Sequence, residues 1–273
     1  MISDLTLLAP WQRVQLARHK ERPHTTDYIR LLCEDFFELH GDRRYGDDRA
    51  IVAGLASIDG CALMLIGHEK GRDLCEMQER NYGMAHPEGY RKALRLLQQA
   101  ERLHIPVVTL IDTPGAFPGL EDEQRGIAQA IAENLQVMSH LRMPIVSIII
   151  GEGGSGGALA LAVADRVLMM EHAIYTVAAP EAAASILWRD KAHVASAAAA
   201  MKITAPELLQ LGLIDDIIEE PAGGAHQDQR AAAAAVKKAL FTHLAALSQL
   251  SLDMLVERRN QRYRAVGAFD EGA

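Results

Sequence analysis

Cysteine is scarce in this chain of 273 residues. There are three, Cys33, Cys61 and Cys75, and no two of them form a CxxC pair. An odd and widely spaced set is not the pattern of a disulfide framework, nor of a zinc site built from cysteines alone. We therefore expect no resident metal in this chain.

Long apolar runs and excess positive charge are also missing. The longest apolar runs, such as Ile145–Ile150, are far too short to cross a bilayer, and the start Met1–Asp4 does not open a signal peptide. The 28 lysines and arginines face 36 aspartates and glutamates, a formal net charge of −8. Nucleic acids and anionic membranes attract broad positive surfaces, so neither is an expected partner. These features predict a cytoplasmic protein.

Aromatic residues make up only 5% of the chain, whereas hydrophobic residues as a whole make up 49%. This composition, rich in alanine, suits a tightly packed α/β fold and does not suit disorder. A chain of this length can bury roughly 70–75% of its unfolded surface, so its core can be stable without disulfide bonds or structural metals. No linker is long enough to separate two domains, and we expect one domain over residues 1–273.

The first part of the chain predicts a helix, a hairpin and a second helix. Thr25–Asp27 can cap a helix over Tyr28–Leu39 that ends at Gly41. Two apolar runs, Ile51–Ile58 and Ala62–Ile66, are joined by Asp-Gly, which is a strong hairpin signal.

A proline begins the second helix, predicted over Pro87–Leu103. Its basic residues Arg91, Lys92 and Arg95 are expected on a solvated face or at a subunit contact.

Two similar strand–turn–helix units come next. Their segments are the strand Val107–Ile111, the turn Asp112–Gly119 and a helix over Asp122–Leu141, then the strand Ile145–Ile150, the turn Gly151–Gly157 and a helix over Ala158–Ala164. Uninterrupted apolar strands followed by helices indicate parallel strands covered on both faces. Both turns should therefore meet at one edge of the sheet, where open α/β sheets bind ligands.

The remaining chain predicts shorter elements. They are strands at Arg166–Met170, Ile174–Val177 and Ile214–Ile218, helices at Ala182–Trp188, Ala192–Ala200 and Pro206–Leu211, a helix over Gln229–Leu250 and an amphipathic tail from Asp253.

The glycine-rich turn between the second strand and its helix carries the clearest chemical signal. Glycines let a ligand approach backbone N–H groups at a helix N-terminus, where the dipole favours a negative oxygen or phosphate. A P-loop is one interpretation, from the spacing of Gly151 and Gly156, but Gly157 and Ala158 stand where lysine and Ser/Thr are required.

Three further interpretations of this turn stay open. It could be a nucleophile elbow around Ser155, with Asp215 or Asp216 and His226 following in the expected order. It could be an oxyanion hole made only of main-chain N–H groups, which needs no side-chain nucleophile. It could also be a turn that merely allows a helix to pack closely on a strand.

Along nearly its whole length, the sequence closely resembles the alpha subunits of bacterial acetyl-CoA carboxylase carboxyltransferases. The matching stretches are Pro10–Gln12 with Leu16–His19, Gly41–Arg43, Gly67–His68 with Lys70–Arg72, Pro87–Leu96, Ile111–Ala116 with Pro118–Gly119, Gly151–Ala160, Ser185–Trp188 and Gly223–His226. They run in order from about Pro10 to Tyr263, so the set is far more specific than any single member.

The resemblance implies a crotonase/ClpP-like superhelix of ββα units with flanking helices. Its core would cover about residues 24–250, after a short N-terminal helical extension. It also implies transfer of a carboxyl group from carboxybiotin, held on a separate biotin carboxyl carrier protein, to acetyl-CoA. The product would be malonyl-CoA, for fatty acid or specialised polyketide synthesis.

The implied partners are a carboxyltransferase beta subunit, in an α2β2 heterotetramer, and the biotin carboxylase that uses ATP. Zinc would belong to the beta subunit alone, in agreement with the few cysteines here.

Carried over residue by residue, the resemblance assigns the site. The N–H groups of Gly156 and Gly157 would form the catalytic oxyanion hole. Cofactor-binding positions would be Gly115, Ala116, Gly153, Gly154 and Ala158, and substrate-binding positions would be Lys70 and Arg72, which could meet a CoA phosphate or a carboxylate.

The chain departs from the family pattern after Val177, where Ala179, Ala182 and Ala183 replace serine, glycine and cysteine. These changes point to a divergent member. Two alternative functions therefore stay open. One is a biotin-independent acyl-CoA hydratase, isomerase or decarboxylase with Glu152 as its acid or base, and the other is a non-catalytic partner of the beta subunit.

Overall fold

The structure, a computed structural model, describes residues 8–267. The predicted domain also includes residues 1–7 and 268–273, and that part of the prediction, with the start Met1–Asp4, lies outside the described residues.

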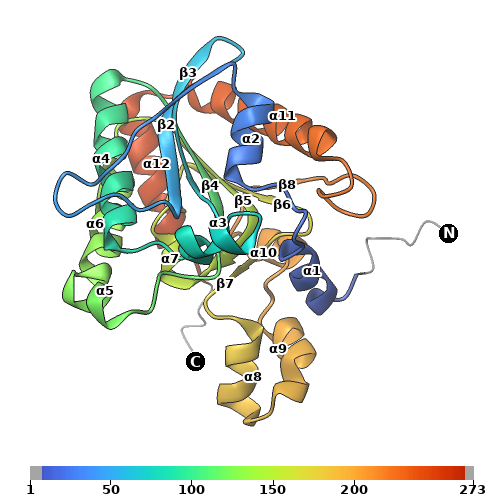
Figure 1. Cartoon of the computed structure of the whole chain (residues 1–273). Coiled ribbons are helices and arrows are strands. Elements are labelled where there is room, and N and C mark those ends of the chain that lie inside the picture. Colours follow the sequence, from blue (N-terminus) through green and yellow to red (C-terminus); the bar gives the residue numbers. More distant parts are fainter. Residues whose placement is uncertain (1–7, 268–273) are drawn as a thin grey trace, which may run out of the picture.

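The chain alternates helices and strands along most of its length (Figure 1). The strands are β1 (Asp35–Glu38), β2 (Ile51–Ile58), β3 (Cys61–His68), β4 (Val107–Thr113), β5 (Ile145–Gly154), β6 (Arg166–Met170), β7 (Ile174–Thr176) and β8 (Asp216–Ile218). The α-helices are α1 (Pro10–Ala17), α2 (Thr25–Leu32), α3 (Leu74–Glu79), α4 (Pro87–Leu103), α5 (Leu120–Gln124), α6 (Ile127–His140), α7 (Ser155–Leu159), α8 (Pro180–Trp188), α9 (Val194–Ala200), α10 (Ala205–Gln210), α11 (Gln229–Leu247) and α12 (Leu252–Arg264). Two 3₁₀ turns are η2 (Asn81–Gly83) and η3 (Lys191–His193).

A mixed sheet organises these elements, with the strand order β1-β2-β3-β4-β5-β6-β8 and with β7 paired to the end of β5. The first three strands are antiparallel, and from β3 onward each pairing is parallel. The β2–β3 hairpin is confirmed, since Asp59 and Gly60 both have positive φ (49° and 71°), as its two-residue turn requires.

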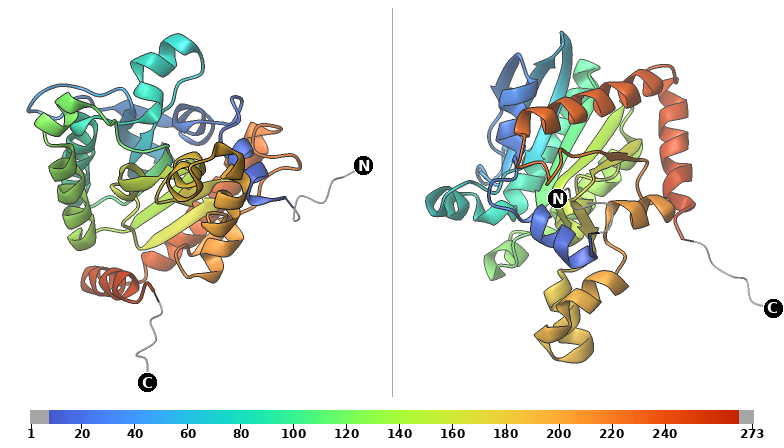
Figure 2. Two further views of the ribbon diagram at one scale, coloured as in Figure 1. Left: turned by 90° about the horizontal axis from the view of Figure 1, so that it is seen from below. Right: turned by 90° about the vertical axis from the view of Figure 1, so that its right-hand side faces the viewer.

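Helices cover both faces of the parallel strands. Helices α4 and α6 lie on one face and α2 and α11 on the other (Figures 1 and 2). Every residue of β4 and β5 is buried. This explains the uninterrupted apolar runs, because strands covered twice have no polar face.

The helix predicted over Tyr28–Leu39 is wrong in its second half. Helix α2 ends at Leu32, and Asp35–Glu38 forms the edge strand β1. Two phenylalanines favour a strand over a helix, and Gly54 of β2 lets β1 come close. A Cβ at Gly54 would lie 2.2 Å from the Phe37 carbonyl oxygen.

Other element boundaries in the structure also differ from the predicted ones. The helix predicted over Asp122–Leu141 is two helices, because Gly126 adopts a left-handed conformation (φ 82°) between α5 and α6. The segment Gly151–Gly154 continues β5, so the following helix begins at Ser155 and ends at Leu159. The helix over Pro87–Leu103 is confirmed.

The hairpin of α8 and α9 projects from the body and is attached to it through α1 (Figure 1). Ile186 and Leu187 on this hairpin are exposed, as is Val177 just before it. No single helix among residues 8–267 is long and apolar enough to cross a membrane. Helices α11 and α12 reach that length and composition only as a pair, bent by 114° at the break.

Candidate functional site

The ends of β4 and β5 meet at one edge of the sheet, as the sequence predicts. The two strands pair in parallel up to Thr113 opposite Gly153. Beyond that point their turns touch, since a Cβ at Gly154 would lie 2.2 Å from the Pro114 oxygen, and one at Gly157 would lie 2.5 Å from the Ala116 nitrogen. Glycine at these two positions is therefore required for the close approach of the two turns.

The chain turns sharply from β5 into α7. Ser155 adopts a left-handed conformation (φ 53°) at this turn. The N–H groups of the first residues of a helix have no acceptor within it, and Gly156 and Gly157 occupy the second and third positions of α7. The turn thus presents backbone donors where a strand gives way to a helix.

Gly156 differs from its glycine neighbours because no backbone crowds it. The nearest atom to its Cβ position is Ile131 Cδ1, at 3.9 Å. Gly156 instead lines a cavity of about 320 Å³. The cavity wall consists of Ser155, Gly156, Leu159, Tyr175, Thr176, Val177, Leu208 and Leu213. Main-chain N–H groups aimed at a developing negative oxygen can stabilise it strongly once the site is closed to water.

A largely buried ion network lies beside this turn, where β3, β4 and β5 end. Lys70 Nζ lies 2.7 Å from Asp112 Oδ1 and 2.7 Å from Glu152 Oε2. His24 Nδ1 lies 3.0 Å from Asp112 Oδ2, and Arg18 Nε lies 2.5 Å from Glu152 Oε1. Asp112 also accepts the Glu152 N–H, at 2.9 Å. The network therefore fixes Glu152, four residues before Gly156.

Both carboxylates of this network are held in the charged state. Burial would raise the pKa of Asp112, but Lys70 and His24 hold it well below its usual range. Burial also opposes charge on Glu152, and Lys70 and Arg18 keep its pKa below the ordinary value. The sequence did not indicate these ion pairs of Glu152, since none of its partners is near in sequence.

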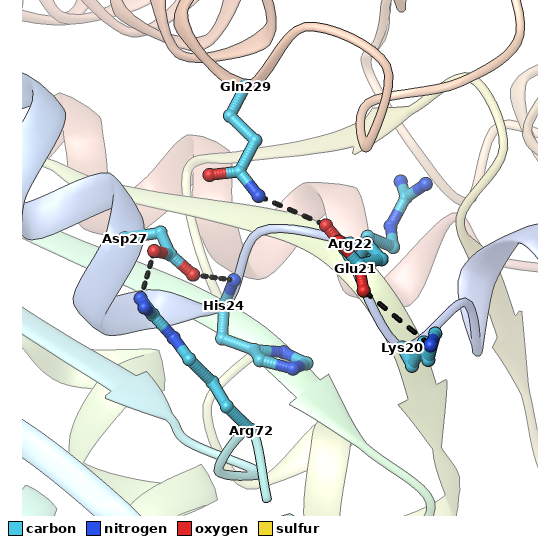
Figure 3. Close-up of a pocket in the computed structure, with 7 residues that line it drawn as sticks. All are labelled: Lys20, Glu21, Arg22, His24, Asp27, Arg72 and Gln229. Carbon is cyan, nitrogen blue, oxygen red and sulfur yellow. Dashed lines mark hydrogen bonds and ion pairs between the residues drawn. The ribbon is translucent and has the colours of Figure 1, made fainter.

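The structure brings together only some of the predicted site residues. Gly115 and Ala116 lie against Gly157, as their predicted role needs. Gly153, Gly154, Gly157 and Ala158 are buried, and among the predicted residues of this turn only Gly156 lines the cavity. Lys70 belongs to the ion network, whereas Arg72 pairs with Asp27 and lines a second cavity (Figure 3). The binding roles of all these residues remain predictions.

The geometry does not favour the nucleophile elbow. Among residues 8–267, no histidine or carboxylate hydrogen-bonds to Ser155. Asp215 pairs with Arg262 and Asp216 with His243. His226 stacks on His19 with ring centroids 3.8 Å apart. No group of three or more His, Cys, Asp or Glu side chains in the described chain is placed to hold a metal ion.

His68, at the end of β3, gives the fold a pH dependence. Burial lowers the pKa of His68 to about 4, from an ordinary 6.5. The unfolded chain therefore takes up this proton first, and the free energy of unfolding falls as the pH drops from 6.5 towards 4. The full effect is about 3 kcal/mol. We expect His68→Gln to reduce this loss, measured by urea unfolding at pH 7 and pH 4.5.

The exposed His140 on α6 provides the control for the substitution itself, since His140→Gln replaces an imidazole by the same amide outside the core. His24 works in the opposite direction, because Asp112 raises its pKa against the effect of burial. An unchanged loss of stability in His68→Gln would contradict the assignment.

Comparison with known proteins adds an independent line of evidence. The family described as acetyl co-enzyme A carboxylase carboxyltransferase-like matches residues 3–267. The acetyl-coenzyme A carboxylase carboxyl transferase subunit alpha of Geobacter metallireducens is 54% identical over 264 residues, covering 97% of this chain and 83% of the relative. The subunit of the same name from Halalkalibacterium halodurans is 54% identical over 262 residues, covering 96% and 81%.

Solved structures share the fold at lower identity. A Pseudomonas malonate decarboxylase hetero-tetramer in complex with coenzyme A superposes with a TM-score of 0.68 at 18% identity, covering 88% of this chain and 94% of the matched chain. Transcarboxylase 12S gives a TM-score of 0.64 at 22% identity, covering 81% and 44%. The crotonase-like fold implied by the sequence is thereby confirmed.

Proposed function

Because the chain belongs to the family of acetyl-coenzyme A carboxylase carboxyltransferase alpha subunits, we propose how its site carries out carboxyl transfer to acetyl-CoA. The observation that carries the proposal is Gly156, whose backbone lines an apolar cavity at the start of α7. The catalytic feature is then main-chain hydrogen bonding, and no side-chain nucleophile is needed.

The cavity suits a biotin ring. That ring is a mostly apolar bicycle with one polar urea, and the wall is mostly apolar with backbone donors on one side. Gly156 lines this space, and its Cβ position is open, with Ile131 Cδ1 as the nearest atom at 3.9 Å. Carboxybiotin, delivered on a separate biotin carboxyl carrier protein, supplies the carboxyl group when it is bound.

The protein's own part is to hold a carbonyl oxygen while charge develops on it. The N–H groups of Gly156 and Gly157 donate to this oxygen, and the turn containing Gly115 and Ala116 supports Gly157 from the neighbouring strand. Gly153, Gly154 and Ala158 shape the same turn from within. One such donor is typically worth a factor of 10² to 10³ in turnover.

The two cations predicted to bind substrate take different parts in this proposal. Lys70, held between Asp112 and Glu152, keeps the turn in place. Arg72 is half-exposed and is the one of the two that can reach the phosphate of an incoming CoA.

Assembly completes the site. We place this single domain, with its crotonase-like core over about residues 24–250, in an α2β2 complex with a zinc-bearing beta subunit. A biotin carboxylase supplies the carboxybiotin that this complex uses. The exposed apolar residues Val177, Ile186 and Leu187 support a protein partner on this side of the molecule.

The biotin-independent alternative needs a free acid or base beside the loop. Glu152 is its candidate, and both of its oxygens are already in ion pairs, with Arg18 and Lys70. The ion pairs therefore favour the carboxyltransferase over the hydratase, isomerase or decarboxylase.

Co-expression with the beta subunit tests the proposal. The purified complex should decarboxylate malonyl-CoA in the presence of a biotin analogue, whereas each subunit alone should not. Decarboxylation that needs no biotin analogue would support the crotonase-type alternative instead. Purification of the beta subunit alone in an active form would support a purely structural role for this chain.

A further inference from the structure

A second cavity, of about 300 Å³, adjoins the ion network through His24, which lines it and contacts Asp112 (Figure 3). It is lined by Lys20, Glu21, Arg22, His24, Asp27, Arg72 and Gln229. None of these residues lines the Gly156 cavity. Three separate parts of the chain form it: the loop before α2 with the first turn of that helix, the loop after β3 and the first residue of α11.

His24 contributes a buried side chain to this cavity. Its side chain is only 9% exposed, and its Nδ1 lies 3.0 Å from Asp112 Oδ2. Among the described residues nothing hydrogen-bonds to its Nε2, although the residue lines the cavity. Burial opposes charge on this imidazole, but the hydrogen bond with Asp112 raises the pKa of His24 above its ordinary value. When the imidazole is protonated, its Nε2–H is a donor without a protein partner among the described residues.

Two further cations face the same space. The Arg72 guanidinium is half-exposed and paired with Asp27, and the Lys20 ammonium is 85% exposed, with Glu21 at 3.8 Å. Arg22 is fully buried and paired with Glu220 at 2.6 Å, so it offers the cavity no free donor. Helix α11 begins at Gln229 in the cavity wall and is capped by the Asp228 side chain.

We propose that this cavity binds a phosphate group, held by Arg72, Lys20 and the Nε2–H of His24. Phosphate fits better than a carboxylate, because it offers two negative charges and enough oxygens for donors that arrive from three directions. The two carboxylates of the lining, Glu21 and Asp27, pair with Lys20 and Arg72 themselves, so a bound phosphate shares these two cations with them. The cavity is at the lower end of the range for small-ligand sites, so it also has room for what the phosphate is attached to.

Two sources can supply this phosphate: a free phosphate or small phosphomonoester, and the 3′-phosphate of CoA. Only the second source rests on the proposed function. Binding of inorganic phosphate to the full chain at pH 7.5, measured by calorimetry without substrate, tests the site itself. Because no turnover is measured, the result is independent of carboxyl transfer.

We expect saturable binding that Arg72→Gln weakens at least tenfold. Lys20→Gln should weaken it several-fold, and this exposed residue can be changed without disturbing the fold. Lys238→Gln, on the exposed side of α11, is the matched control and should bind phosphate as the unmodified chain does.

Competition with CoA and dephospho-CoA identifies the source. Displacement of phosphate by CoA alone assigns the site to the 3′-phosphate of CoA, and displacement by neither assigns it to a separate phosphorylated ligand. The proposal fails if phosphate does not saturate, or if Lys20→Gln and Arg72→Gln bind it as tightly as Lys238→Gln does.

Discussion

Gly157→Val is expected to lower carboxyl transfer by at least a factor of 10² to 10³ in the complex with the beta subunit. The new Cβ would lie 2.5 Å from the Ala116 nitrogen and 2.8 Å from the Tyr90 hydroxyl, both in packed surroundings. Backbone cannot yield as a flexible side chain can, so the two turns must move apart. The N–H group of residue 157 then leaves the position from which it would donate.

The same substitution should cost stability only moderately. Overpacking a buried site typically costs about 1–3 kcal/mol. Malonyl-CoA decarboxylation with a biotin analogue measures the activity, and size-exclusion chromatography of the complex measures assembly. If the rate is unchanged while assembly is normal, the catalytic role of this turn is lost and the chain is a structural partner of the beta subunit.

Gly156→Ala is the matched variant one residue earlier. Its Cβ has room, with Ile131 Cδ1 at 3.9 Å, and its backbone is not left-handed. The chain should therefore fold as before and keep both N–H groups. Because Gly156 lines the cavity, we expect the added methyl group to raise the KM for the biotin analogue, with a smaller fall in kcat than in Gly157→Val. Equal effects in the two variants would indicate that the cavity and the turn cannot be separated in this way.

The framework of this site could be predicted from sequence because it depends on local patterns. The apolar runs of β4 and β5 are uninterrupted because both faces are covered, and that pattern is visible without a structure. Parallel order then places both glycine-rich turns at the same edge. The Asp-Gly pair likewise fixed the β2–β3 hairpin, since the turn and both strands are adjacent in the chain.

Charge pairs between distant segments could not be predicted. Arg91 and Lys92 were expected on a solvated face or at a subunit contact, but both are largely buried, Arg91 with Asp42 and Lys92 with Asp47. A helical period shows which residues share a face and does not show which loop folds over that face. For the same reason, no local pattern indicates that Asp112, directly after an apolar run, pairs with Lys70 and His24.

Removing the Asp112 carboxylate should destabilise the protein by about 3–5 kcal/mol, the usual cost of leaving a buried partner uncompensated. In Asp112→Ala, the largely buried Lys70 keeps only Glu152, and His24 and the Glu152 N–H both lose their acceptor. Guanidinium unfolding measures the loss. Asp253→Ala, which breaks an exposed pair with Arg142, is the control and should change stability by less than about 1 kcal/mol.

Lys70→Met separates the charge pair from the packing around it. If Asp112 and Lys70 stabilise each other, the double variant should lose less than the sum of the two single losses, with a coupling of about 1–3 kcal/mol. The pair would then act as one unit that holds Glu152, and through it the turn that carries Gly156. Additive losses, or an Asp112→Ala protein within about 1 kcal/mol of the unmodified chain, would mean that strand packing alone holds the turn in place.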